Sequence, residues 1–309
     1  MEGLDINNTG KSKIVINDTI LLFPERYLEL YFIDYLETNK ILYEINDTKV
    51  TIKCKDILSA NKLYDKLQEL QISITHTQHW YDDLHYLTFK SLFIELDKND
   101  ITILLDEYQD EKDLIDKINQ LDIPFEYVFV RLNSVSPKDS TPKVESSLKR
   151  DVSPNKIENN ENLALNIITL IRNSKRCTDT FKLNWEHSLM IREWKNIDPN
   201  SEFRCFIYQN RLTAISQYHC YNKYNYHLSP NEVRDMICKF YKDNYVNFIY
   251  EDCIMDIIIN KYKDKYVIEI VEFNSFGSGI SGAALYNWER DENILFNTKS
   301  LLPDIRINL

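Results

Sequence analysis

Two strand-like segments near the C-terminus carry oxygen-bearing side chains at matching places. Asp256 lies inside the apolar run 254–259, and Glu272 and Asn274 end the segment that follows it. Residues two apart on a strand point to the same face of a sheet, and an antiparallel pairing would bring Asp256 opposite them. A buried carboxylate is costly unless a positive group satisfies it. Hard oxygen ligands that leave room for phosphates and water are what Mg²⁺ prefers, so this pattern is typical of a magnesium site.

Arginines stand in three further segments that otherwise read as apolar strands. Arg131 ends the first, Arg192 lies in the second, and Glu202 and Arg204 begin the third. A guanidinium group donates hydrogen bonds in a fork that matches phosphate oxygens. On neighbouring strands, these side chains would line a groove for a triphosphate. The structural alternative is a network in which Asp256 pairs with Arg192 or Arg204, and the residues alone leave both interpretations open.

Two other patterns carry weaker signals. The stretch 277–282 matches Gly-x-Gly-x-x-Gly, but a dinucleotide fold needs a further strand with an acidic residue about 20 positions later. The 27 residues after Gly282 contain no such strand, so we expect a flexible loop beside the metal-binding end of the sheet. The tyrosine-rich stretch 218–226 could stack bases, although packing at an edge or contact with a protein partner is the commoner role.

Apolar periodicity divides the chain into strands and helices of ordinary length. The helix at 229–244 has the clearest start signal, with Ser229 as N-cap, Pro230 at the first position and Glu232 three residues after the cap. Residues 1–20 are polar and expected to be loose, and a helix-like stretch opens at Pro24. The predicted strands are 41–45, 49–53, 91–96, 125–132, 187–194, 202–208, 211–218, 252–260 and 266–273, and the predicted helices are 57–70, 110–121, 163–173, 229–244 and a short one at 283–289.

These elements predict an α+β fold in a chain long enough for about two domains. Residues 1–75 form a small α+β extension, residues 76–290 the main domain, and residues 291–309 a C-terminal tail. Within the main domain, residues 142–160 lack periodicity and are rich in Ser, Pro, Lys, Asp and Asn. That composition is typical of a flexible loop or lid.

Composition excludes several classes of protein. A hydrophobic content of 43% with 12% aromatic residues excludes a wholly disordered chain. The net charge of −11 and pI near 5.1 disfavour a general coating of nucleic acid, although a local basic groove stays open. No apolar run approaches the roughly 20 residues of a membrane span, and the first residues lack the features of a signal peptide. The six cysteines form no Cys-x-x-Cys pair, so we expect reduced thiols in a cytoplasmic protein.

Several short motifs follow one another along the chain from Trp80 to Glu289. Arg-Leu-Asn at 131–133 precedes Ser-Pro-Lys-Asp at 136–139, and further motifs stand at 191–194, 201–206, 214–217, 254–259, 272–274 and 285–289. Together they resemble the cell division cycle protein 123 family, whose Lys-Leu-Asn-Trp-Ser-x-Pro-Lys/Arg-Asp motif is similar to 131–139. Residues 1–75 show no match to this family.

The resemblance implies an α+β fold of the ATP-grasp type, in which ATP and Mg²⁺ lie between two α+β lobes. Family members act as assembly factors for eukaryotic translation initiation factor 2 and contact its gamma subunit. Carried over by position, the metal ligands are Asp256, Glu272 and Asn274. Glu186 with Leu189, Met190 and Ile191 falls where an adenine-contacting linker is expected. The full set implied for ATP is Val128, Val130, Arg131, Glu186, Leu189, Met190, Ile191, Arg192, Glu202, Arg204, Tyr218, Asp256 and Glu272.

Three positions depart from the family pattern. Arg131 replaces the usual Lys, Tyr218 and His219 replace an Arg-Asp pair, and Glu272 replaces the usual Asp. Two other functions stay open. One is an ATP-dependent ligase of the ATP-grasp type, joining RNA ends or a carboxylate to an amine, although the acidic charge and the lack of a second catalytic lysine disfavour it. The other, favoured only by the substitutions at Arg131 and at Tyr218 and His219, is a fold that no longer binds nucleotide.

Overall fold

The protein is described by a computed structural model. The described residues are 75–309, except 107, 141–155, 183–186 and 279–280, together with 11–16, 19–24, 36, 41, 43–46, 49–52, 62–63 and 65–66. The chain divides into two compact units. Unit 1 contains residues 1–75 and 197–309, and unit 2 contains residues 76–196. Glu186, expected in the adenine-contacting linker, lies outside the described residues.

The N-terminal part of unit 1 contains a four-stranded sheet in the order β2-β1-β4-β3. Its strands β3 and β4 confirm the predicted strands at 41–45 and 49–53, whereas β1 and β2 correct the expectation that residues 1–20 are loose. The β-branched run Ile-Val-Ile in β1 favours a strand even beside lysines. Of the predicted helix at 57–70, residues 62–63 and 65–66 are described and helical, and the rest of it, like most of the helix-like stretch after Pro24, lies outside the described residues. The strands are β1 (Lys11–Ile16), β2 (Thr19–Pro24), β3 (Tyr43–Asn46) and β4 (Lys49–Ile52).

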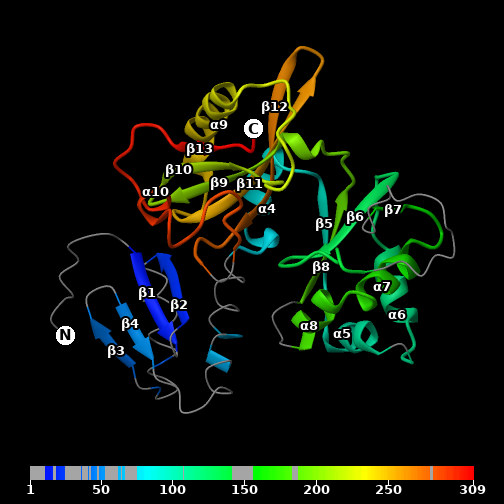
Figure 1. The fold of residues 1–309 in the computed structure, drawn as a ribbon. Helices are drawn as coiled ribbons and strands as arrows, with labels where there is room; N and C mark the ends of the chain where they lie inside the picture. The colour runs from blue at the N-terminus through cyan, green and yellow to red at the C-terminus, as the bar shows by residue number, and fades with distance from the viewer. Residues whose placement is uncertain are drawn as a thin grey trace. The chain divides into compact units, whose positions relative to one another are not determined.

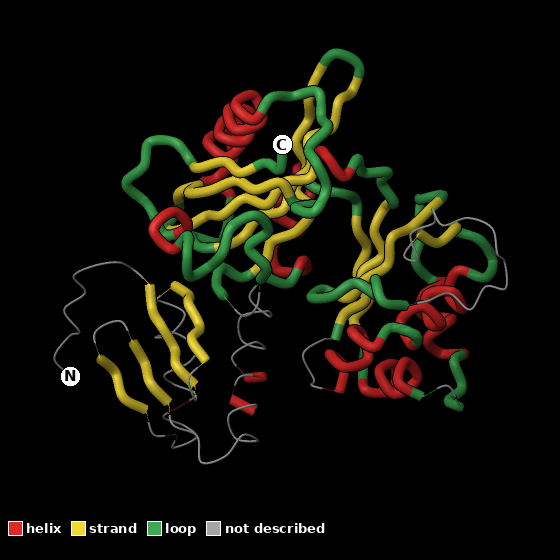
Figure 2. The backbone as a smooth tube through the Cα atoms, viewed as in Figure 1, coloured by secondary structure: helices red, strands yellow, loops and turns green. Residues whose placement is uncertain are grey.

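Unit 2 is an antiparallel sheet in the order β5-β8-β6-β7 with the helices α5–α8 gathered against one face (Figures 1 and 2). The strands are β5 (Ser91–Glu95), β6 (Tyr127–Leu132), β7 (Lys156–Glu158) and β8 (Ser188–Glu193). The helices are α4 (Thr77–Leu84), α5 (Lys98–Leu105), α6 (Lys112–Asn119), α7 (Leu163–Arg172) and α8 (Lys175–Lys182), with a 3-10 turn at His85–Leu87 after α4. The core of this unit lies between the sheet and α5–α8.

The predicted strands and helices of unit 2 are confirmed, with three helices added. The helices α4, α5 and α8 have only eight residues each, which is too short for helical periodicity to show in the sequence. The strand β7 differs from the expected loop at 142–160, because Lys156–Glu158 pairs with β6. Three residues give too little alternation to reveal such a strand. Residues 141–155 lie outside the described part of the chain.

The C-terminal part of unit 1 is a five-stranded sheet in the order β12-β11-β9-β10-β13. The helix α9 packs against β10 and β13, and residues 276–278 and 281–296 cover the opposite face with a cluster of rings around Phe206. The strands are β9 (Glu202–Tyr208), β10 (Arg211–Gln217), β11 (Cys253–Tyr262), β12 (Lys265–Asn274) and β13 (Asp304–Arg306), and the helices are α9 (Pro230–Asn244) and α10 (Glu292–Leu295), with 3-10 turns at Pro199–Ser201 and Tyr245–Asn247.

Local sequence signals predict two features of this sheet correctly. The capping box of α9 forms as predicted, since the Ser229 hydroxyl accepts from the backbone N–H of Glu232 and the Glu232 carboxylate accepts from the backbone N–H of Ser229. The predicted hairpin turn between β9 and β10 is also present. Both turn residues, Gln209 and Asn210, adopt the left-handed conformation that such turns require, with φ of 48° and 56°.

The C-terminal end differs from the sequence prediction in two ways. The short helix predicted at 283–289 is a series of turns, because the Asn287 side chain accepts hydrogen bonds from the backbone N–H groups of Glu289 and Arg290 and so competes with helix formation. The expected tail at 291–309 instead contains α10 and β13, and β13 pairs in parallel with β10. Among the described helices, none has the length and apolarity needed to cross a membrane.

Candidate functional site

The predicted acidic residues converge on one face of the C-terminal sheet. Asp256 on β11 lies directly opposite Glu272 on β12 and Arg204 on β9. The amide Nδ2 of Asn274 lies 3.0 Å from Oδ2 of Asp256 and 3.4 Å from Oε1 of Glu272. The antiparallel pairing that the sequence required is therefore present, and it brings the three oxygen-bearing side chains together.

A β-bulge makes this convergence compatible with an apolar core. The register of β12 against β11 shifts between Asp256 and Ile257, so that Glu272 faces Asp256 while Ile270 faces Ile257. In a regular strand Ile270 and Glu272 would share a face. The extra residue, Val271, turns Glu272 toward the polar cluster and leaves Ile270 on the opposite face, where it is fully buried.

Asp256 is held by Arg204 in a buried two-pronged ion pair. The Nε and Nη2 atoms of Arg204 donate to the two carboxylate oxygens at 2.9 and 2.7 Å. Nη1 of Arg204 donates to the carbonyl of Gly282 at 2.5 Å, and the guanidinium carbon lies 5.0 Å from the ring centre of Tyr218. The structural alternative from the sequence is thus observed with Arg204. Glu272 and Asn274 face the same carboxylate, so Asp256 would belong both to the ion pair with Arg204 and to a metal site.

Burial and charge act in opposite directions on this pair. Burial raises the pKa of Asp256 to about 6, even though Arg204 acts to lower it. Burial alone would lower the pKa of Arg204, but the attraction of Asp256 raises it above its ordinary value, so this guanidinium stays charged. The site therefore combines a fixed cation with carboxylates that favour further positive charge.

The donor set fits a hard cation that keeps other ligands. It offers two carboxylates and one amide. Within the described parts of the chain, no group of three or more His, Cys, Asp or Glu side chains is arranged to hold a metal ion. Mg²⁺ is commonly bound through one or two carboxylates, with water and phosphate oxygens completing its shell. The amide of Asn274 now donates to the carboxylates, and a half-turn about its last torsion would present its oxygen instead.

Two of the residues that depart from the family pattern, Tyr218 and His219, contact this cluster. The Tyr218 ring lies against the Arg204 guanidinium, and its backbone N–H donates to the carbonyl of Glu202. Burial raises the pKa of the Tyr218 hydroxyl, which stays protonated. Nε2 of His219 lies 3.0 Å from Oε2 of Glu202. Tyr218 therefore stacks on Arg204, and His219 is hydrogen-bonded to Glu202.

In unit 2, strand alternation separates the predicted nucleotide residues into two sets. Val128, Val130, Leu189 and Ile191 are fully buried and belong to the core against α5–α8. Val130 and Ile191 are direct partners across β6 and β8. The side chains of these four residues are occupied by packing, so only their backbone groups are available to a ligand.

The basic residues lie on the other face of the same sheet. Arg131 pairs with Met190, and Arg192 with Ser91, which places all four on the face opposite the helical core. Nε of Arg131 donates to the carbonyl of Leu132 at 2.9 Å, and Nε of Arg192 donates to Oγ of Ser91 at 2.9 Å. The strand register therefore puts Arg131 and Arg192 on one face of the sheet, which the sequence alone could not fix.

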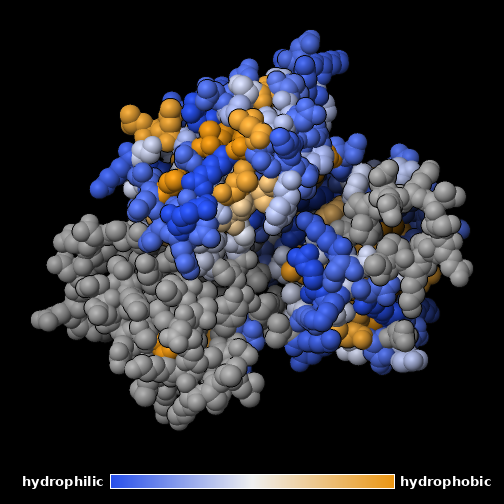
Figure 3. All heavy atoms as spheres, viewed as in Figure 1, coloured by the Kyte–Doolittle hydropathy of each residue, from blue (hydrophilic) through white to orange (hydrophobic). Residues whose placement is uncertain are grey.

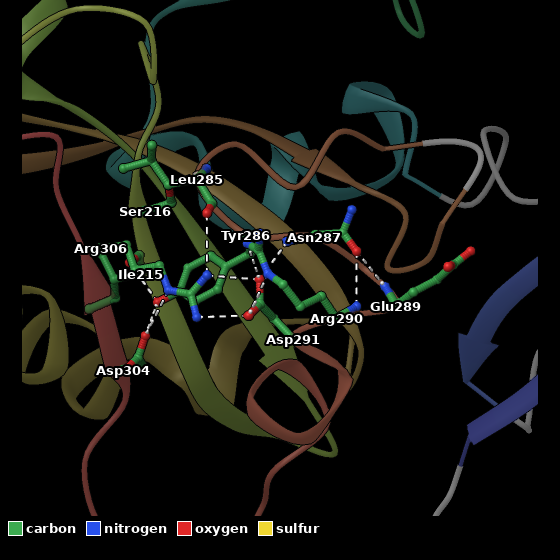
Figure 4. A network of polar contacts seen from close by, with 10 residues as sticks. All are labelled: Ile215, Ser216, Leu285, Tyr286, Asn287, Glu289, Arg290, Asp291, Asp304 and Arg306. Atoms are coloured by element: carbon green, nitrogen blue, oxygen red, sulfur yellow. Dashed lines mark hydrogen bonds and ion pairs between the residues drawn. The ribbon is translucent and has the colours of Figure 1, made fainter.

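A polar network that sequence reasoning missed fixes the motif at 285–289 (Figure 4). The Tyr286 hydroxyl donates to Asp304 at 2.6 Å and to the carbonyl of Ile215 at 3.2 Å. Asp291 accepts from both terminal nitrogens of Arg306 at 2.8 Å, and Arg306 also lies 4.2 Å from the Tyr286 ring centre. These contacts join the motif to β10 and to β13, and so anchor the C-terminal segment that contains β13. The spacing from Asp291 to Arg306 gave no signal in the sequence.

Comparison with known proteins identifies the family. The D123 family model matches residues 20–307. The chain belongs to the D123 family. A CDC123-like protein of Acanthamoeba polyphaga mimivirus is 35% identical over 319 residues, which cover 93% of this chain and 92% of the relative. The translation initiation factor eIF2 assembly protein of Xenopus laevis is 36% identical over 110 residues, which cover 34% of this chain and 31% of the relative.

The fold agrees with the same family. The solved structure of Cdc123 from Schizosaccharomyces pombe has a TM-score of 0.59 at 20% identity, and the match covers 78% of this chain and 98% of that chain. The predicted resemblance and α+β fold class are therefore confirmed. The family match also begins at residue 20, which corrects the expectation that residues 1–75 lie outside it.

Proposed function

We propose that this D123 protein binds ATP together with Mg²⁺ and serves as an assembly factor for translation initiation factor 2, contacting its gamma subunit in the cytoplasm. The observation that carries the proposal is the convergence of Asp256, Glu272 and Asn274 beside Arg204. Several D123 relatives are named translation initiation factor eIF2 assembly proteins, which supports the choice of partner. The family resemblance, with its implied ATP-grasp fold, supports the choice of ligand.

In this proposal the cluster on β11 and β12 holds the metal. Asp256, Glu272 and Asn274 provide its protein ligands, and Mg²⁺ would supply positive charge that binds ATP phosphates. Arg204 balances the buried Asp256 charge and fixes the orientation of that carboxylate. An ion pair that is buried and two-pronged keeps its geometry, because moving either partner leaves a charge without compensation.

Residues of unit 2 are assigned to the nucleotide itself. Arg131 and Arg192 bind phosphate oxygens through guanidinium N–H groups, which suit phosphate geometry better than a lysine does. Leu189 and Ile191 contact the base through backbone groups, since their side chains face the core. Met190 is the residue of this segment whose side chain lies on the same face as the arginines.

Calorimetric titration with ATP, with and without Mg²⁺, tests the proposal. The double variant Glu272→Gln, Asn274→Ala keeps the Arg204–Asp256 pair and is preferred to a change at Asp256, which would leave a buried cation unpaired. We expect it to weaken Mg²⁺-dependent ATP binding by about tenfold or more, equivalent to about 1.4 kcal/mol. Glu269→Gln, on the same strand, is the matched control and should bind like the wild type.

The assembly role needs a second readout. Pull-down with the gamma subunit of translation initiation factor 2 should recover the wild type in the presence of ATP and Mg²⁺.

Unchanged ATP affinity in the folded double variant would remove the metal assignment. Steady formation of ADP, AMP or pyrophosphate would instead favour the ligase alternative.

A further inference from the structure

The hairpin of β11 and β12 projects beyond the rest of its sheet. Strand β11 pairs with β9 only over Cys253–Ile258, whereas its pairing with β12 continues to Tyr262 and Lys265. Residues 259–268 therefore form a two-stranded ribbon, called the basic finger below, which rises past β9 and β10 in Figure 1. A two-stranded ribbon by itself is only marginally stable in water.

A neighbouring segment supports the base of the basic finger. The Tyr226 hydroxyl donates to the carbonyl of Ile259 at 2.7 Å. The His227 ring stacks on Tyr266 with a centroid separation of 5.4 Å and an interplanar angle of 22°. Tyr226 and His227 are themselves in ring contact at 4.1 Å. These contacts fix the ribbon before any partner arrives, which lowers the entropy cost of binding.

The basic finger carries a local excess of positive charge on an acidic protein. Lys261, Lys263 and Lys265 are exposed, with Asp264 the one acidic residue of the finger, while the whole chain carries −11. Its surface is hydrophilic in Figure 3. Lysines can protect a strand edge against aggregation. Lys263, however, occupies a left-handed turn position with φ of 53°, where asparagine or glycine costs less.

Apolar side chains and an open strand edge accompany this charge. Tyr262 is 52% exposed and Val267 is 41% exposed. The register places them on the same face of the ribbon. Among the strands that the structure describes, β12 pairs only with β11, so the part at Lys265–Glu269 presents its outer edge to solvent. An edge of this kind can accept an added strand.

We propose that the basic finger is a docking site for an extended acidic segment of a protein partner, which adds as a strand to the outer edge of β12. Its carboxylates would meet Lys263 and Lys265, and its apolar residues would cover Tyr262 and Val267. A nucleic acid fits less well, because the net charge of −11 repels a long phosphate backbone and the aliphatic Val267 cannot stack a base. This proposal does not depend on ATP or metal binding.

The first test uses a fluorescein-labelled peptide of about twelve residues that repeats Glu-Glu-Val-Val, so that each face of the added strand carries both glutamate and valine, with fluorescence anisotropy as the readout. We expect binding by the wild type at low salt, weakened about tenfold in the variant Lys263→Glu, Lys265→Glu. The matched control is Lys242→Glu, Lys299→Glu, which changes the net charge equally at exposed lysines outside the finger and should bind like the wild type. A peptide with proline in place of valine lacks the backbone N–H groups that would pair with the edge of β12, so it should not bind.

Hydrogen exchange provides the second test, since an added strand should slow exchange of backbone amides within 265–269. Absence of peptide binding, equal loss in the control variant, or unchanged exchange at β12 would overturn the proposal. Tighter binding of a labelled oligouridine of the same length, lost in the Lys263→Glu, Lys265→Glu variant, would overturn it in favour of a nucleic-acid partner.

Discussion

Replacing Asp291 with asparagine removes the charge at the centre of the network that anchors the C-terminal segment. The carboxylate accepts two hydrogen bonds from Arg306 at 2.8 Å, one from Nη2 of Arg290 at 2.9 Å and one from the backbone N–H of Asn287 at 2.8 Å. The side chain of Asp291 is 7% exposed and that of Arg306 is 28% exposed. Asparagine keeps the shape of the side chain, so the change isolates the contribution of the charge.

The expected cost follows from these contacts. A hydrogen bond to a charged group contributes about 1.5–3 kcal/mol and a neutral one about 0.5–1.5 kcal/mol, so weakening both bonds from Arg306 costs roughly 2–3 kcal/mol. Breaking a fully buried pair costs about 3–5 kcal/mol, and the partial exposure of Arg306 puts this variant at the lower end, about 3 kcal/mol. In a unit of this size, each kcal/mol lowers Tm by about 2–4 °C, which gives a fall of roughly 6–12 °C.

The loss should also depend on pH in a defined direction. Hydrogen bonds from Arg306 hold the pKa of Asp291 far below its usual range, against the opposing effect of burial. A carboxyl group with a lowered folded-state pKa stabilises the fold fully above its unfolded pKa, and this stabilisation is lost as pH falls through the folded value. The difference in stability between wild type and variant should therefore be constant from about pH 7 to 5 and narrow below about pH 4.

Differential scanning calorimetry across this pH range measures both effects. Glu289→Gln is the control, because Glu289 is an exposed acidic neighbour whose backbone N–H, not its carboxylate, joins the network. A fall in Tm no larger than that of the control would refute the reasoning. So would a difference that keeps its size below about pH 4, since the charge of Asp291 would then not be its source.

Three further changes give separate tests of the structure. Tyr218→Phe keeps the ring over Arg204 and should leave the free energy of unfolding within about 0.5 kcal/mol, whereas Tyr218→Ala should lower it by about 2 kcal/mol or more in urea titrations. Asp139→Ala removes acceptors for the Ser174 hydroxyl and the backbone N–H of Arg176 at the start of α8, so we expect a loss of about 1 kcal/mol and faster amide exchange in that helix. Gln209→Asn should raise stability by roughly 0.5 kcal/mol, because asparagine tolerates the left-handed turn better, and an unchanged urea midpoint would count against a strained turn.

Local sequence signals determined much of this protein. Strand alternation located β9 to β12, and the Ser229 capping box placed the start of α9, because these patterns depend on neighbours within a few residues. The same alternation is enough to put Glu272 and Asn274 on one face of their strand. The family motifs indicated the fold class and the residues proposed for ATP and Mg²⁺.

Tertiary structure decided how distant residues meet. The register of three strands places Arg204, Asp256 and Glu272 in line, and only the bulge at Val271 turns Glu272 toward Asp256 while Ile270 stays in the core. The sequence did not show whether Asp256 pairs with Arg192 or with Arg204, because pairing between residues far apart in the chain depends on sheet order. The sequence also did not predict the strand β13, because three residues carry almost no periodicity. Their conformation is set by the edge of β10, beside which they lie.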